Sequence, residues 1–414
     1  MGKIYNSVFV FQPKRFHFLL ITFIFNFCFI QTFAQQPVTV DSSLLERIAS
    51  LEQKVNYQRL GEDHFMMVGL TTFGFVSNKT TSTFGGVSQV SKTNSLADAS
   101  HYEFSPMFLW RHGNKFLLEF EPSFSGGQLG VNWGAISYFA TPGLIIRGGY
   151  LVLPFGAYNK RLAAGWINKL ASDPEGVTGA TDYALEVEGG FQAGSMKWSY
   201  DLAISNGMQL LADGSLQNAG ITDNNKNRAI TGRIGWLPFS NSSLELGFSV
   251  MTGKVGDAGS NTENVKANLY ALDLSLVENI KPFQLNIKGQ YSITDINHAD
   301  YLNPADSSNY SFDNHTTTGY IMAALRPMFI ANKILKNFEL AARFGNYTTP
   351  ANSLRGTKDN SFAVGLDYWV NWRTVVKFSY EAIKGTNTIS ANLGGTPGAV
   401  TQSNSMYLQF SIQL

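Results

Sequence analysis

Within many apolar stretches of this chain of 414 residues, the charged side chains fall on one of the two alternating sets of positions. In the stretch 114–124, Lys115, Glu119 and Glu121 alternate with phenylalanine and leucine. Charged side chains in this arrangement suggest ion selection rather than catalysis. Where they line a narrow water-filled path, their charges select among ions. The basic residues that share this alternation are Arg111, Lys115, Arg147, Lys197, Arg233, Lys288, Arg343, Arg373 and Lys377. Acidic residues share it too, Glu119 and Glu121 among them, and slightly outnumber the basic ones, so we expect a path of mixed charge.

A second group of basic residues lies in the stretch 154–176, where Lys160, Arg161 and Lys169 fall between two alternating stretches. The same stretch carries apolar residues at near-helical spacing, namely Leu162, Trp166, Ile167 and Leu170. In an exposed loop these apolar side chains would face water, whereas a loop packed against an inner wall would bury them. We therefore expect this connection to fold inward and to place its three cations at the narrowest point of the path. The alternative is that they are ordinary solvated loop charges.

The sequence lacks the patterns that indicate catalysis or metal binding. Its single cysteine, Cys28, lies within the first 34 residues, so the rest of the chain offers no thiolate. The remaining histidines that we considered are His64, His101, His112, His298 and His315. They show neither the paired spacing of a zinc site nor a serine–histidine–aspartate setting. We predict no catalytic residue, no metal and no cofactor, and the balance of 31 Lys+Arg against 30 Asp+Glu gives no sign of nucleic-acid binding.

The alternation itself identifies the elements that carry these charges. In the stretch 404–414, Leu408 and Phe410 fall on one parity, and Gln409 and Ser411 on the other. A period of two predicts a β-strand with one apolar and one polar face. A tilted strand of about 9–11 residues crosses the hydrocarbon of a bilayer. Spanning strands must form a closed barrel, because an open edge would leave backbone groups unpaired in lipid.

The same reading along the chain predicts about sixteen strands, with about eighteen as the alternative. They lie near 64–76, 101–111, 114–124, 129–140, 143–153, 182–192, 195–206, 227–238, 243–252, 267–278, 283–295, 317–329, 337–347, 361–370, 372–382 and 404–414. Short connections alternate with long polar ones such as 77–100 and 154–181, as in outer-membrane barrels. Aromatic residues that we assign to girdles at strand ends are Tyr102, Trp110, Trp236, Trp369 and Trp372. A soluble β-sandwich also alternates, but its strands are shorter.

The N-terminal residues indicate export. Lys3, Lys14 and Arg15 precede an apolar run over 16–30, which is typical of a secretory signal peptide. A membrane anchor is the alternative, but the run is short for one. We therefore divide the chain into a signal peptide (1–34), a periplasmic linker with a short coiled-coil helix (35–61) and a transmembrane barrel (62–414).

The linker contains one predicted amphipathic helix over 41–55. Its apolar residues Leu44, Ile48, Leu51 and Val55 are spaced four, three and four apart, which fits a coiled-coil seam. We interpret the seam as a periplasmic bundle between copies of the chain. A single helix packed on the rim of its own barrel is the alternative.

Several segments resemble the phosphate-selective porin O and P family. They are the strand at 228–239, which ends Trp-Leu-Pro-Phe, the Phe-Glu-Leu-Ala-Ala-Arg-Phe strand at 338–344, the hairpin 362–380 and the stretch 149–156. The resemblance implies a trimeric barrel of about sixteen strands with an inward third loop and basic residues that select anions. The mixed charge of the predicted lumen departs from that pattern of basic residues.

These observations together predict an outer-membrane porin in the bacterial outer membrane, through which small hydrophilic solutes diffuse passively. Anions such as phosphate are the expected solutes, and a homotrimer is the expected assembly. A general or sugar-type diffusion channel is the alternative. An outer-membrane barrel enzyme or adhesin fits less well, since no catalytic cluster or large extra domain is visible.

Overall fold

The computed structural model describes residues 63–96, 103–125, 127–162, 167–176, 181–218, 220, 223, 225–302, 308–387 and 398–414. The chain divides into two compact units after residue 60, and all described residues belong to the second unit. The predicted signal peptide and the coil residues Leu44, Ile48, Leu51 and Val55 lie outside the described residues. Both therefore stay predictions.

Long strands make up most of the described chain. The barrel strands are β1 (His64–Phe84), β3 (Glu103–His112), β4 (Phe116–Ser125), β5 (Gln128–Thr141), β6 (Leu144–Val152), β7 (Thr181–Ala193), β8 (Met196–Ser205), β11 (Ala229–Leu237), β12 (Leu244–Lys254), β13 (Lys266–Ile280), β14 (Phe283–Ile296), β17 (Asn314–Arg326), β18 (Phe338–Thr348), β19 (Thr357–Asn371), β20 (Thr374–Asn387) and β21 (Ala399–Gln413). The shorter elements are β2 (Val87–Leu96), β9 (Met208–Leu210), β10 (Leu216–Asn218), β15 (Tyr301–Leu302), β16 (Asn309–Tyr310), η2 (Tyr158–Leu162) and η3 (Leu335–Asn337). Among the described residues, no helix combines the length and the apolar character needed to cross a membrane.

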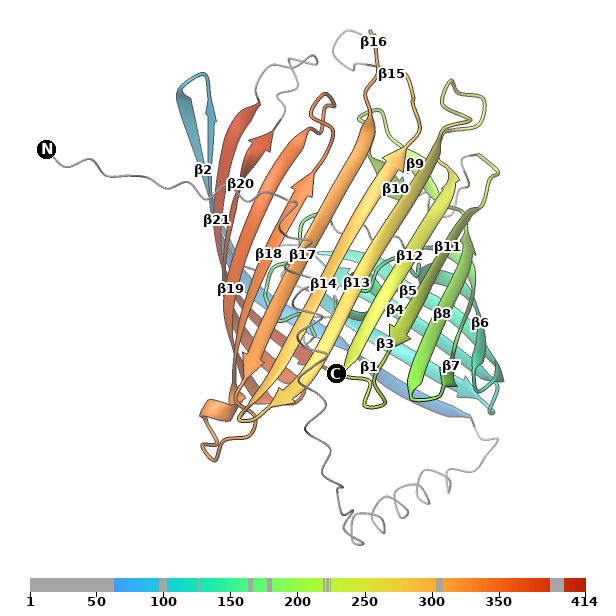
Figure 1. Cartoon of the computed structure of the whole chain (residues 1–414), viewed down its shortest axis with the longest axis vertical. Helices are drawn as coiled ribbons and strands as arrows, with labels where there is room; N and C mark the ends of the chain where they lie inside the picture. Colours follow the sequence, from blue (N-terminus) through green and yellow to red (C-terminus); the bar gives the residue numbers. More distant parts are fainter. Residues whose placement is uncertain are drawn as a thin grey trace, which may run out of the picture. The chain divides into compact units, whose positions relative to one another are not determined.

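The strands form one closed antiparallel sheet. Each barrel strand pairs with its neighbours in the sequence, and the sheet closes where β1 pairs with β21, with Leu70 opposite Gln413 and Thr83 opposite Val400. The result is a barrel of 16 strands, which Figure 1 shows from the side. The predicted number of about sixteen is confirmed, and the alternative of eighteen is wrong.

The first long connection is partly strand, which the sequence analysis did not predict. β1 continues through the stretch assigned to a polar loop as far as Phe84, turns at Gly85 and Gly86, and returns as β2. Both glycines have a positive φ, 56° and 81°, as a tight hairpin turn requires. β2 pairs with one half of β1 and β3 with the other half, so that β2 and β3 together fill one position of the barrel. Figure 1 shows the β1–β2 hairpin at the upper left.

The two faces of the barrel wall differ in polarity. On β21, Phe410 points outward with 38 % of its surface exposed, whereas Gln409 (6 %) and Ser411 (0 %) point inward and are buried. Ser411 lies 3.2 Å from the hydroxyl of Thr72 on β1, so the seam is polar on its inner side. An apolar exterior and a polar interior are what a transmembrane barrel requires.

The predicted aromatic girdle is correct in part. Trp110 and Trp372 are outward-facing and exposed near strand ends. Trp369 was assigned to the girdle, and that prediction is wrong: its side chain is buried inside the barrel, and its Nε1 donates to Glu339 Oε2 at 2.8 Å. The reason is its parity, because Trp369 shares the inward face of β19 with Asp367.

Candidate functional site: the inward-folded third connection

The connection 153–180 joins β6 to β7, and its described residues lie inside the barrel; we call it the third connection, because it follows the β1–β3 and the two-residue β4–β5 connections on the same side of the barrel. The amide of Gly156 donates to Ser249 Oγ on β12 at 3.0 Å. Further along, the amide of Ala171 donates to Ser379 Oγ on β20, also at 3.0 Å. β12 and β20 lie far from β6 in the order of the sheet. The connection therefore crosses the lumen, as the sequence analysis expected.

Apolar burial holds the connection against the inner wall. Leu153 and Phe155 join a buried cluster with Met251 and Leu269, which face inward from β12 and β13. Leu170, which is completely buried, joins a second cluster with residues of β17, β18 and β19. The wall residues of that second cluster are Tyr320, Met322, Ala324, Ala341 and Ala363. The small alanine side chains leave room for the loop. Burying each leucine or phenylalanine of the loop contributes about 1.5–3 kcal/mol to the stability of this packing.

A glycine permits the first close approach of the connection to the wall. Gly156 has a φ of 66°, which residues with a side chain rarely adopt. A Cβ at this position would collide with the side-chain amide of Gln290. That same amide accepts hydrogen bonds through Oε1 from the backbone N–H groups of Ala157 (3.0 Å) and Tyr158 (3.1 Å).

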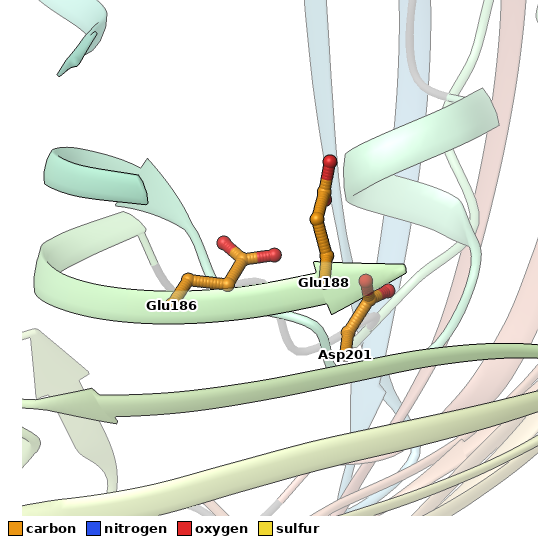
Figure 2. Close-up of side chains that lie close together, drawn as sticks. All are labelled: Glu186, Glu188 and Asp201. Atoms are coloured by element: carbon orange, nitrogen blue, oxygen red, sulfur yellow. The ribbon is translucent and has the colours of Figure 1, made fainter. Parts of the chain in front are cut away.

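Lys160, on the η2 turn, is surrounded by three carboxylates. Its ammonium contacts Glu186, lies 3.0 Å from Glu188 Oε2 and lies 3.7 Å from Asp201 Oδ2. Figure 2 shows Glu186 and Glu188 on one strand and Asp201 on the adjacent strand. Burial alone would lower the pKa of Lys160, but Asp201, Glu186 and Glu188 raise it overall. The three carboxylates could hold a metal ion, but the Lys160 ammonium already supplies the cation.

The other two loop cations are also ion-paired with the wall. Arg161 Nη1 lies 2.5 Å from Glu245 Oε1 on β12. Lys169 Nζ lies 3.1 Å from Glu339 Oε2 on β18, and 4.8 Å from the centre of the Trp369 ring. All three predicted constriction residues therefore lie inside the barrel, and each carries a carboxylate partner.

Two predicted lining residues reach from the wall to the connection. Arg343 Nη1 donates to the carbonyl oxygen of Ser172 at 2.6 Å, and its Nη2 donates to Glu381 Oε1 at 2.7 Å. Lys377 Nζ donates to the carbonyl oxygen of Asn168 at 2.7 Å. Both side chains are almost completely buried. Both side chains therefore hold the loop against the wall through hydrogen bonds, and neither charge is exposed to open water.

Two further predicted lining residues are ion-paired within the wall. Arg233 Nη2 lies 2.6 Å from Asp273, and its Nη1 lies 3.0 Å from Glu245. Arg147 lies 3.0 Å from Glu188. Because Glu188 is also a partner of Lys160, the ion pairs of loop and wall form one network across β6, β7 and β8.

Four further basic residues lie at the short-turn end of the barrel. They are Arg111, Lys115, Lys197 and Arg373. Arg111 donates to the carbonyl of Gly113 in the β3–β4 turn at 3.3 Å, and Lys197 donates to the carbonyl of Ser240 at 3.2 Å. These four lie apart from the third connection, so the structure does not gather all predicted lining residues in one place.

Three carboxylates on β3 and β4 have a different environment. Glu119 accepts a hydrogen bond from Ser137 (3.2 Å), while Glu103 and Glu121 accept from the Asn132 amide (2.9 and 3.3 Å). In the described part of the chain, none of the three forms an ion pair, and each is partly exposed inside the barrel. Parity predicted that Glu119 and Glu121 face the lumen.

The sequence does not predict which loop cation pairs with which wall carboxylate. Alternation predicts that Glu186, Glu339 and Glu381 face inward, but it carries no signal for which loop residue each one meets. That choice depends on how the connection crosses the lumen. The pairing also depends on neutral residues that bind the loop, such as Ser249 and Gln290. No sequence motif predicts that these residues contact the loop.

Comparison with known proteins supports the fold. No family model and no curated protein matches the chain. Among solved structures, the outer membrane channel DcaP of Acinetobacter baumannii aligns with a TM-score of 0.56 and 11 % identity, over 86 % of this chain and 99 % of that one. An anion-selective porin from Comamonas acidovorans aligns with a TM-score of 0.51 and 14 % identity, over 85 % and 100 %. The chain therefore has the fold of a porin-like barrel, and its apolar exterior places it in the bacterial outer membrane.

Proposed function

We propose that this protein is an outer-membrane porin through which small hydrophilic solutes diffuse passively. The carrying observation is a closed barrel with a polar interior, narrowed by a connection that crosses the lumen. A barrel of this width encloses water rather than a packed core of side chains. No bond is made or broken, and the solute gradient supplies the driving force.

The direct test is reconstitution of the purified protein into planar bilayers. Discrete conductance steps that scale with salt concentration are expected of a water-filled path. Protein that is folded and inserted, but gives no steps above the lipid background at any voltage, would contradict the proposal. Heat-denatured protein is the control for leaks caused by detergent.

The narrower hypothesis of an anion or phosphate channel rests on the family resemblance and on Lys160, Arg161 and Lys169. The structural neighbour from Comamonas acidovorans is also an anion-selective porin. Against the hypothesis, each of the three loop cations is paired with a wall carboxylate. A cation whose charge is neutralised at contact distance attracts a passing anion weakly. We therefore favour the general diffusion channel over the phosphate channel.

We also propose that Lys160, Arg161 and Lys169 define the constriction. The triple variant K160A/R161A/K169A leaves the wall carboxylates without partners in the lumen. We expect its reversal potential in a KCl gradient to move toward cation preference, and more so in dilute salt. Equal potentials for variant and wild type would remove these residues from the filter.

A further inference from the structure

We propose that the lumen prefers cations, and that the carboxylates of Glu103, Glu119 and Glu121 on β3 and β4 set this preference. The inference rests on the proposed diffusion function and names the class of solute that it favours. The solutes are small hydrated cations and organic ammonium ions, rather than the anions that the resemblance implies. The preference arises from the balance of charge along the path, and it requires no site at which an ion is held.

The cations of the third connection are all engaged by groups of the barrel wall. Lys160 is shared by three carboxylates, Arg161 is held by Glu245, and Lys169 by Glu339. The wall cations Arg343 and Lys377 are buried beneath the loop and bond to its carbonyl groups. Each of these charges therefore attracts an anion in the water-filled path only weakly.

The charges around η2 do not balance. Around η2, the ion-paired network contains four cations, Lys160, Arg161, Arg147 and Arg233, and five carboxylates, those of Glu186, Glu188, Asp201, Glu245 and Asp273. Even the paired network is therefore short of positive charge. A passing solute meets an acidic excess rather than a neutral wall.

The wall formed by β3 and β4 carries carboxylates that are bonded only to neutral groups. Glu103 and Glu121 share one neutral donor, the Asn132 amide. Glu119 reaches Arg147 only through the hydroxyl of Ser137, which accepts from that guanidinium at 3.1 Å. In the described residues these carboxylates have no cationic partner within 4.0 Å, and all three are partly exposed inside the barrel.

The strand that closes the barrel adds no compensating charge. β21 contains no lysine, arginine, aspartate or glutamate. Its buried inner residues Ser405, Gln409 and Ser411 offer only hydroxyl and amide groups. Carboxylates that border a water path inside low-dielectric walls favour cations over anions, as acidic rings do in cation channels. On the wall formed by β3 and β4 the three carboxylates outnumber the two cations at its short-turn end, Arg111 and Lys115, so this side of the lumen keeps an acidic excess.

The test is the zero-current potential across a KCl gradient for single channels in neutral lipid. Wild type is expected to favour potassium. The triple variant E103Q/E119Q/E121Q, which keeps side-chain shape and hydrogen bonds, is expected to bring the potential toward zero. The change should be larger in 0.01 M salt, where the Debye length is about 30 Å, than in 1 M salt, where it is about 3 Å.

Two further variants sharpen the result. D300N removes one carboxylate from an exposed outer connection, where Asp300 is 65 % exposed, and should leave the potential unchanged. E119K reverses one lumen charge and should move the potential toward anion preference, even if the triple variant folds poorly. Gradients of choline chloride and of potassium gluconate then test whether the preference extends to organic ions.

The outcomes separate this inference from the proposed function. Conductance with anion preference in wild type overturns the inference and leaves the diffusion channel intact. Cation preference that E103Q/E119Q/E121Q and E119K both leave unchanged removes these residues from the mechanism. Folded protein without any conductance contradicts the proposed function itself.

Discussion

Arg343 joins the third connection to the wall through a single side chain. Its guanidinium is 1 % exposed and bonds both to the Ser172 carbonyl and to Glu381. A buried ion pair adds little net stability, but removing one partner leaves an uncompensated charge that costs about 3–5 kcal/mol. The position of the loop therefore depends on a few such side chains.

Replacing Arg343 by methionine is expected to release the loop segment near Ser172. Because the carboxylate of Glu381 then lacks its cationic partner, a rearrangement that exposes this carboxylate to water becomes favourable. Single-channel recordings should show a larger or noisier conductance than wild type. R373M, which removes an exposed arginine from the β19–β20 turn, is the matched control. Recordings that R343M leaves as quiet as those of R373M would show that Arg343 does not hold the loop.

Glu175 is expected to make the loop sensitive to pH. Burial, reinforced by the nearby charges of Asp359 and Glu381, raises its pKa to about 7. A raised pKa means that the folded protein favours the protonated acid, so negative charge develops only as the pH rises through this value. Cation preference should therefore increase as the pH rises from below to above about 7.

The measurement is the reversal potential over a pH series. E175Q, which cannot ionise, should flatten the step that wild type shows in this range. A variant with the same pH profile as wild type would assign the step to another group. Asp257 lies on an outer connection, and D257N serves as a control for the loss of an acid elsewhere.

At the scale of elements, the entry of the third connection into the lumen depends on one turn. Gly156 has the positive φ that starts the loop along the inner wall. G156A adds a Cβ where the amide of Gln290 lies and forces a conformation that costs about 1–2 kcal/mol for a residue with a side chain. We expect a lower melting temperature and a loop that is more readily cleaved by protease.

G113A is the matched control for Gly156. Gly113 also has a positive φ, 57°, but nothing lies within 4 Å of a Cβ built there. It should show the backbone cost alone. Equal losses of stability in both variants would mean that the Gln290 contact contributes nothing.

Strand parity gives a second prediction at this scale. Phe410 faces lipid and Gln409 faces the lumen beside Lys377. A charge on the lipid face costs up to about 2–4 kcal/mol for a basic residue at the midplane, and less for an acid. F410D should therefore lower the yield of heat-resistant barrel in the outer membrane, whereas Q409D should not. Equal yields would mean that the assignment of the two faces is reversed.

Much of the barrel could be predicted because its signal is local. A two-residue period reports which face of a strand meets lipid, as on β21, and this holds whatever the neighbours are. The β1–β2 hairpin was missed because both faces of β2 are mostly polar, and its few apolar residues, Val87, Val90 and Leu96, do not gather on one face. Trp369 was misplaced because its residue type was weighed above its parity. The ion-pair partners of Lys160 and Lys169 could not be predicted, because they depend on tertiary contacts that leave no pattern in the sequence.

At the scale of the whole molecule, assembly is the open prediction. We propose a homotrimer, from the Leu44, Ile48, Leu51 and Val55 seam and the family resemblance. Cross-linking or native mass measurement in detergent should give three copies. Deletion of 41–57 should weaken the trimer if the seam forms a bundle. A trimer that survives the deletion would assign assembly to the barrel walls, and a monomer in the intact chain would contradict the proposal.

The seam between β1 and β21 has a consequence for how the chain reaches its final form. It joins residues more than 300 positions apart, such as Leu70 and Gln413, while the other strands pair with close sequence neighbours. Local hairpins can form in any order, but this contact forms late, since the cost of closing a loop rises with its length. Until then both edge strands present unpaired backbone groups that hydrocarbon does not tolerate. Insertion and ring closure must therefore happen together, which makes the seam the place where an assembly factor or a misregistered strand has its greatest effect.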